Sequence, residues 1–114
     1  MKALIVYAHP EPTSFTAALK DAAVRAIEGA GHEAVVSDLY AEGFNPVAGR
    51  HDFLTVADPG RFHYQTEQSH ASRNKGFAPD IAREQARLAD AGLVILVFPL
   101  WWGGVPAIDR KSVV

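Results

Sequence analysis

Two short segments of this 114-residue chain contain the residues best suited to bind a charged or planar ligand. The first, residues 9–16, combines His9 with hydroxyl side chains and two prolines and leads into a predicted helix. Free backbone N–H groups and the helix dipole favour an anion at such a position. The segment therefore indicates a phosphate or pyrophosphate site, while the simpler alternative is an ordinary helix N-cap at Thr13 or Ser14.

The second segment, residues 99–104, places Trp101 and Trp102 directly before a pair of glycines, Gly103 and Gly104. Tryptophans belong more often to a core or an interface than to a cofactor site. Here the glycines remove side-chain bulk beside the two indole rings, which favours a planar ligand stacked on them. We therefore expect this segment to contact a planar cofactor.

Strands must bring these two segments together. Apolar runs over residues 2–7, 33–39 and 93–98 predict three strands, and the third is predicted to be buried on both faces. Apolar residues at spacings of three and four predict helices over residues 15–30 and 81–90. The pattern predicts an α/β fold with a doubly wound parallel sheet of strand order 2-1-3. In that sheet the two segments lie side by side at the carboxyl ends of the first and third strands.

The same spacing assigns faces to the two helices. We expect Phe15 and Leu19 on the buried face of the first helix. In the second helix we expect Leu88 on the buried face, with Glu84 and Arg87 in solvent. A further helix is expected to begin near Pro106, because proline is favoured at the first helical position.

The segment between the second strand and the second helix, residues 40–78, shows no sustained helical or strand period. We predict a long connection with a helical turn near residues 51–56. Its aromatic residues are Phe44, Phe53, Phe62 and Tyr64. Such a connection is either functional and wraps a ligand, or packs as a surface loop, and the sequence leaves both interpretations open.

Composition restricts the class of protein. The chain is 48% hydrophobic and 21% charged, which predicts a single globular domain over residues 1–114. A formal net charge of −2 argues against nucleic-acid binding. The chain has no cysteine, and its five histidines lack the spacing of metal ligands, so we expect no metal site. The apolar runs are too short for a membrane span or a signal peptide, which predicts a soluble cytoplasmic protein without membrane insertion.

Together these residues resemble the flavodoxin-like NAD(P)H:quinone oxidoreductase family of the DT-diaphorase type. The resemblance extends from Ala3 to Ile108. Seven ordered segments carry it, which is more specific than any single motif. They are residues 3–9, 13–15, 37–46, 62–64, 80–85, 93–95 and 98–107.

The resemblance implies FAD bound noncovalently in a homodimer, with FMN less expected, and NAD(P)H as co-substrate. The implied reaction is a two-electron transfer in which NAD(P)H gives a hydride to the flavin and a quinone then takes it. The cofactor supplies this chemistry, and the protein orients it. The resemblance assigns no catalytic residue to this chain.

It does assign cofactor-binding residues. Thr16 stands where relatives often have asparagine, His63 where they usually have glutamine, and Gly103 where an aromatic is common. The implied contacts are with the diphosphate and adenine for His9, Phe15 and Thr16, with the flavin for His63, and with the isoalloxazine ring for Leu100, Trp101, Trp102 and Gly103.

The family pattern continues with a Lys-Gly-Trp-type helix, two strands and a glycine-rich flavin loop, and residues 109–114 do not match it. We therefore interpret the chain as the N-terminal portion of the fold, truncated after the third strand. This interpretation leaves an alternative function: a noncatalytic remnant or interaction module that associates with an intact homologue or with a transport protein.

Overall fold

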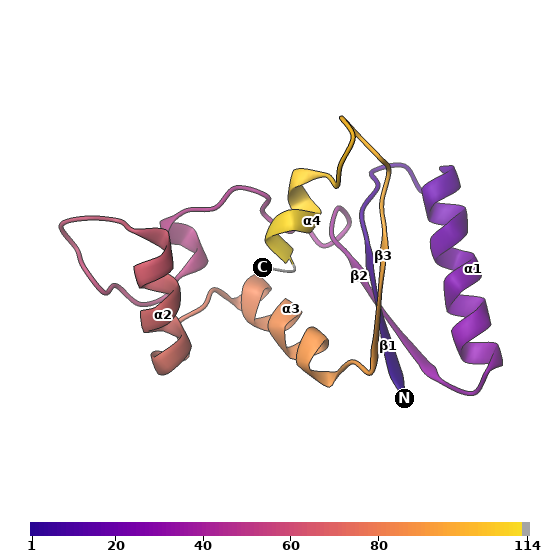
Figure 1. Cartoon of the computed structure of the whole chain (residues 1–114), viewed down its shortest axis with the longest axis horizontal. Coiled ribbons are helices and arrows are strands. Elements are labelled where there is room, and N and C mark those ends of the chain that lie inside the picture. Colours follow the sequence, from indigo (N-terminus) through magenta and orange to yellow (C-terminus); the bar gives the residue numbers. More distant parts are fainter. Residues whose placement is uncertain (113–114) are drawn as a thin grey trace.

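A computed structural model describes residues 1–112 and contains a sheet of three parallel strands (Figure 1). The strands β1 (Lys2–Tyr7), β2 (Glu33–Asp38) and β3 (Leu93–Val97) lie in the order β2-β1-β3. β1 pairs in parallel with both neighbours. The predicted α/β fold, with a parallel sheet of order 2-1-3, is confirmed.

Helices cover both faces of the sheet. Figure 1 shows α1 on one side, α3 and α4 on the other, and α2 further out along the long axis. No helix within residues 1–112 is long and apolar enough to cross a membrane. The helical segments are α1 (Phe15–Gly29), the 3₁₀ turn η1 (Arg50–Asp52), α2 (Tyr64–Asn74), α3 (Pro79–Asp90) and α4 (Ala107–Ser112).

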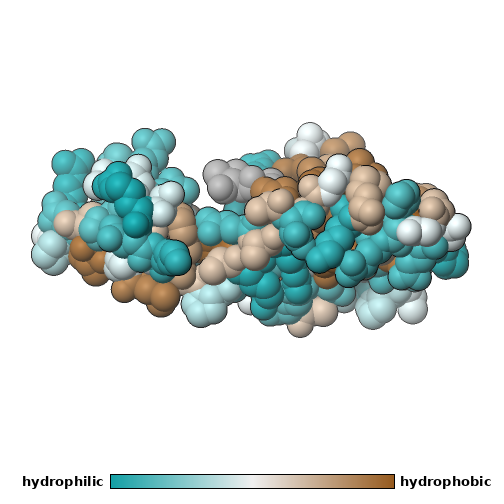
Figure 2. Space-filling model, turned by 90° about the horizontal axis from the view of Figure 1, so that it is seen from below, coloured by the Kyte–Doolittle hydropathy of each residue, from teal (hydrophilic) through white to brown (hydrophobic). Residues whose placement is uncertain are grey.

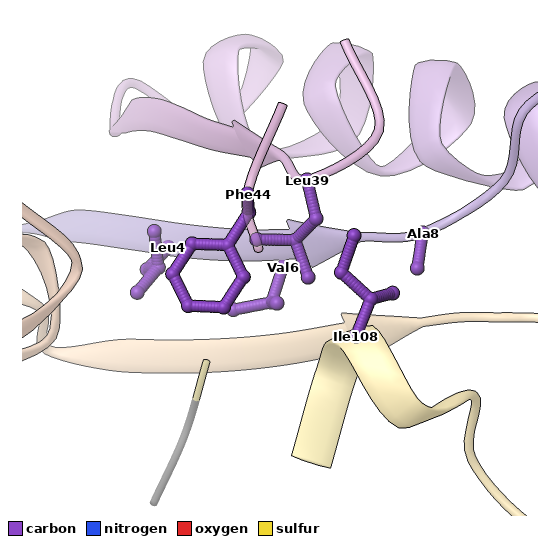
Figure 3. Close-up of a cluster of buried hydrophobic side chains, with 6 residues drawn as sticks. All are labelled: Leu4, Val6, Ala8, Leu39, Phe44 and Ile108. Carbon is purple, nitrogen blue, oxygen red and sulfur yellow. The ribbon is translucent and has the colours of Figure 1, made fainter. Parts of the chain in front are cut away.

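Alternation along β1 divides the core into two layers, because successive strand side chains point to opposite faces. Leu4, Val6 and Ala8 face the side of α3 and α4, where they pack with Leu39, Phe44 and Ile108 (Figure 3). Ile5 and Tyr7 face α1 and pack with Ala17 and Val97. Each large apolar side chain buried in this way contributes roughly 1.5–3 kcal/mol, so β1 holds both layers in place.

β3 is more exposed than its apolar run alone predicts. Leu93, Val94 and Leu96 are 44%, 39% and 43% exposed, and Val97 is the one fully buried residue of the strand. Within residues 1–112, β3 lies at the edge of the sheet and has β1 as its single neighbour. The prediction of a strand buried on both faces is therefore wrong for this structure.

α1 begins and ends close to its predicted bounds, but its buried face differs from the predicted one. Phe15 and Leu19 are 77% and 48% exposed. Val24, outside the predicted apolar stripe, packs against the sheet, together with Ala23 and Ile27, which belong to that stripe. The spacing of apolar residues identified the helix correctly and placed Phe15 and Leu19 wrongly, because the helix is rotated relative to the predicted stripe.

The predicted faces of α3 hold for Ile81, which packs against the core, but are wrong for Glu84 and Leu88. Glu84 is only 4% exposed, while Leu88 is 42% exposed. The hydroxyl of Ser37, a buried residue of β2, donates to Glu84 at 2.7 Å, and Arg87 Nη1 donates to Ser37 at 3.0 Å and to Glu84 at 3.0 Å. A carboxylate is tolerated in the interior when it is paired and hydrogen-bonded. Ser37 thus allows a charged face of α3 to pack on the sheet.

Residues 50–77 form an arm that includes η1 and α2. Figure 2 shows it as a lobe joined to the body by a narrower region, with hydrophobic surface along one edge. The ring of Phe53 lies 5.1 Å from Tyr64 and 6.2 Å from Phe62, measured between centroids. The expected helical turn is η1, but the prediction of an otherwise unstructured connection is wrong. The aromatic rings of the arm pack on one another, and both interpretations of this connection stay open.

Asp52 joins this arm to the body. Its side chain is buried and lies 2.6 Å from Lys111 Nζ of α4, and it accepts a hydrogen bond from the Tyr64 hydroxyl at 2.8 Å. Burial raises the pKa of Asp52, but these contacts and the Gly49 amide outweigh it and hold the pKa below its ordinary value. Burial and the Asp52 carboxylate raise the pKa of Tyr64 to about 12. Asp52 is therefore a charged carboxylate held by a cation.

The neighbouring Asp109 has no such partner. It is 1% exposed, and neither of its carboxylate oxygens has a hydrogen-bond partner within residues 1–112. Burial raises the pKa of Asp109 to about 6. An ionised carboxylate here is desolvated without compensation.

Asp109→Asn is expected to stabilise the fold at neutral pH. The pKa of about 6 in the folded chain lies above the ordinary 3.8. Below pH 4 the carboxyl group is protonated and its burial costs no ionisation energy, but the native chain loses stability as the pH rises through 6. About two pKa units correspond to about 3 kcal/mol at pH 7. Urea unfolding between pH 4 and 8 measures this difference. The free energy of unfolding of the variant should depend less on pH than that of the native chain. The control is Asp58→Asn, at an exposed aspartate; equal pH slopes for native chain and Asp109→Asn would contradict the assignment.

Candidate functional site

The two segments singled out from the sequence meet at the carboxyl ends of β1 and β3. The backbone N–H of Ala8 donates to the carbonyl of Val97 at 3.0 Å. Immediately beyond, the rings of His9 and Trp101 lie 5.8 Å apart between centroids, tilted by 55°. The prediction that these segments lie side by side is confirmed.

The first turn of α1 offers free backbone donors. Ser14 is the N-cap, because its hydroxyl accepts from the Ala17 amide at 3.0 Å. The amides of Phe15 and Thr16 donate to no acceptor within residues 1–112. Unpaired N–H groups at a helix N-terminus point toward an anion and share the favourable end of the helix dipole. This turn can therefore bind a phosphate through its backbone.

His9 adds a side-chain donor to this turn. Its Nδ1 accepts a hydrogen bond from the Glu11 amide at 2.9 Å. In a neutral imidazole one nitrogen accepts and the other carries the proton, so Nε2 is the donor. The local loop thus fixes the tautomer that can donate to an anion.

Glu11 is a feature that sequence reasoning missed. Its carboxylate accepts from both the amide and the hydroxyl of Thr13 at 3.0 Å. These two hydrogen bonds lower the pKa of Glu11, which is therefore anionic at neutral pH. The Thr13 donors are occupied, so the donors left for an external anion are the amides of Phe15 and Thr16 and the ring of His9. The signal in the sequence was an acid two residues before a threonine.

The turn formed by residues 101–104, the tryptophan turn, has an unusual backbone. Trp102 and Gly103 have φ angles of 55° and 74°, and the Gly104 amide donates to the Trp101 carbonyl at 3.1 Å. Two positive φ angles in a two-residue turn favour Asn-Gly, and a bulky residue there costs roughly 1–2 kcal/mol. Trp102 is fully exposed, and its amide and that of Gly103 have no acceptor within residues 1–112. With Leu100, which is 73% exposed, the turn presents an apolar surface with two free donors.

His63 lies elsewhere. It is the N-cap of α2, and its Nδ1 lies 2.9 Å from the Thr66 hydroxyl. Together with Asp58 and Arg61 it lines a pocket on the arm. Figure 1 shows α2 well separated from the loop that follows β3. Within one chain the structure brings together the other seven predicted cofactor residues and does not bring His63 to them.

The arrangement suits a ligand that carries both a phosphate group and a planar ring. Backbone and imidazole donors lie on one side of the β1–β3 junction, and an exposed indole with free amides lies on the other. Within residues 1–112 no group of three His, Asp or Glu side chains is arranged to hold a metal ion. The donors and the exposed indole are the features of this junction that a ligand with a phosphate group and a planar ring would contact.

Comparison with known proteins agrees with this geometry. A profile of proteins with a flavodoxin-like fold matches residues 1–110. The chain is 50% identical over 108 residues to NAD(P)H dehydrogenase (quinone) 1 of Rattus norvegicus and 46% identical to that of Cavia porcellus. It is 45% identical to ribosyldihydronicotinamide dehydrogenase (quinone) of Pongo abelii. The matches cover 94% of this chain but 39–47% of those relatives, so the chain spans less than half of their length.

Solved structures give the same likeness. A putative quinone reductase from Klebsiella pneumoniae superposes with a TM-score of 0.86 at 40% identity, covering 99% of this chain and 44% of that one. An NAD(P)H:quinone oxidoreductase from Methanothermobacter marburgensis superposes with a TM-score of 0.76 at 26% identity, covering 96% and 50%.

Trp102→Asn is expected to raise the free energy of unfolding by about 1 kcal/mol, because asparagine tolerates a positive φ that a bulky aromatic does not. Urea denaturation of the chain without added ligand measures the change. Leu100→Asn, in the same loop and not at a positive φ, is the control and should not stabilise. A Trp102→Asn variant no more stable than the native chain would show that the turn carries no strain.

Proposed function

Because the chain belongs to the family of flavodoxin-like fold, we propose that it binds FAD and takes part in the two-electron reduction of a quinone by NAD(P)H. The observation that carries the proposal is the junction at Ala8 and Val97, where free helix amides and an exposed tryptophan turn adjoin. The names of the relatives support quinone as the substrate class. FAD is preferred to FMN on the family resemblance.

Each half of the junction has a proposed role. The amides of Phe15 and Thr16 and the ring of His9 hold the diphosphate. Trp101, Trp102 and neighbouring residues of the turn line the isoalloxazine, and their free amides donate to its polar edge. When bound, the flavin accepts and returns the hydride. The residues of this chain bind it and orient it.

The position of His63 supports a homodimer as part of the proposal. The arm that carries it extends away from the site of its own chain, and the molecule measures 50 × 32 × 21 Å along its axes (Figure 1). An extended arm can reach a second copy. We propose that His63 of the partner subunit completes each flavin site.

The exposed side chains of β3 favour a second candidate. Leu93, Val94 and Leu96 are exposed apolar side chains on an edge strand, and such edges pair readily with other chains. The chain would then act as a noncatalytic interaction module that associates with an intact homologue or a transport protein. Co-elution with a full-length homologue on gel filtration, without flavin uptake, would support this candidate over the first.

FAD titration tests the first proposal directly. The native chain is expected to gain bound-flavin absorbance bands and to show quenched tryptophan fluorescence. His9→Ala is expected to weaken FAD binding about tenfold, the effect of one lost charge-assisted hydrogen bond. His70→Ala, a half-buried histidine of α2 far from the junction, is the control and should bind as the native chain does. A folded chain that takes up no flavin would refute the proposal.

Mixing two variants tests the role of His63. His9→Ala and His63→Ala chains, each weak in FAD binding alone, are co-expressed. A heterodimer then contains one site with both native histidines, because each chain supplies what the other lacks. Recovered tight FAD binding in the mixture is expected. A mixture as weak as the two separate variants would place His63 outside the partner's site.

A further inference from the structure

A groove with largely apolar walls lies beside the tryptophan turn. It encloses about 360 Å³, within the range of small-molecule sites. Its walls are mostly aromatic and aliphatic, and its lining includes Tyr40, Pro46, Trp101, Trp102, Val105 and Arg110. Arg110, from α4, is the one charged side chain that residues 1–112 contribute to its lining.

The guanidinium of Arg110 is available to a ligand. A Cβ added at Gly104 would lie 3.3 Å from Arg110 Nη2, so the guanidinium rests against the backbone of the tryptophan turn. Within residues 1–112 its side chain forms no ion pair and no hydrogen bond. Two buried acids of this region do not neutralise it: Asp109, its neighbour in sequence, is buried, and Asp52 is paired with Lys111.

We propose that the quinone reduced at this site carries an anionic substituent, which Arg110 binds while the rings lie along the groove. This inference rests on the proposed function for the identity of the ligand as a quinone. The groove adjoins the proposed flavin surface, because Trp101 and Trp102 belong to both. A planar ring in the groove therefore lies next to the group that reduces it.

The charge pattern selects the substituent. Among the described residues, the groove has one unpaired guanidinium and no carboxylate in its lining, which complements a planar ring with a carboxylate or a sulfonate. Arginine is suited to this role because its planar fork of donors matches the two oxygens of a carboxylate. A neutral quinone would occupy the same walls and leave the guanidinium unpaired.

Two anthraquinones that differ only in charge test the inference. The chain contains two tryptophans, both in the groove wall, so fluorescence quenching reports this site. Anthraquinone-2-carboxylate is expected to bind about tenfold tighter than anthraquinone-2-carboxamide, because one charge-assisted hydrogen bond contributes about that much affinity. N-acetyltryptophanamide corrects for absorbance of the probes. Equal affinities would overturn the inference.

Variants assign the preference to Arg110. Arg110→Gln is expected to make the two affinities equal, and Arg110→Lys to keep part of the preference because the charge remains. Arg25→Gln, which removes an exposed arginine from α1, is the control of equal charge change and should keep the whole preference. Loss of preference in Arg25→Gln would show a general charge effect and overturn the assignment. Inorganic phosphate that displaces the carboxylate probe at equal concentration would show an anion site without ring recognition and would also overturn it.

The readout separates this inference from the proposed function. Probe binding is measured without flavin and repeated with FAD present. FAD binding without discrimination between the two probes refutes the anionic substrate alone. Discrimination between the probes in a chain that binds no FAD refutes the flavoenzyme and retains the groove as a site for anionic aromatic molecules.

Discussion

The hydrogen bond from the Ala8 amide to the Val97 carbonyl is the contact on which the candidate site depends. It extends the pairing of β1 and β3 by one step, and the chain turns away from the sheet directly after it on both sides. His9 and Trp101 can therefore approach to 5.8 Å although 91 residues separate them in the sequence. Burial of β1 in two apolar layers keeps this junction rigid, because a shift of β1 would disturb both layers at once. The loops contribute the ligand-binding groups, and the buried strand positions them.

A second constraint connects the arm to the body. Lys111 lies 2.6 Å from the buried carboxylate of Asp52 and also donates to the carbonyls of Asn45 and Val47 at 2.7 and 2.8 Å. A buried ion pair adds little net stability compared with an apolar pair, but loss of one partner leaves a buried charge. The pair therefore determines the position at which the arm attaches and adds little to the stability of that attachment. The direction of the arm, and with it the position of His63, follows from this attachment.

The sequence predicted the sheet order, the junction and the helices α1 and α3, because these depend on apolar periodicity and on the rules of parallel strand connection. It did not predict α2, which has a buried alanine but no apolar stripe and is defined instead by His63 at its N-cap and by Lys75 with φ of 53° at its end. It placed Glu84 in solvent because a buried partner, Ser37, lies 47 residues away. Pairing between distant polar residues leaves no periodic signal, whereas a continuous apolar face does.

The same limit explains α4, where three consecutive charged residues have three different environments. Asp109 is buried without a partner, Arg110 lines the groove, and Lys111 is buried against Asp52. The family resemblance ends at Ile108, so it assigned no role to any of them. Their environments follow from helical geometry, since successive residues of a helix point about 100° apart and so meet different surroundings. The free charge of Arg110 depends on its neighbours: Lys111 satisfies Asp52, Asp109 faces the interior, and the guanidinium is left facing the aromatic groove.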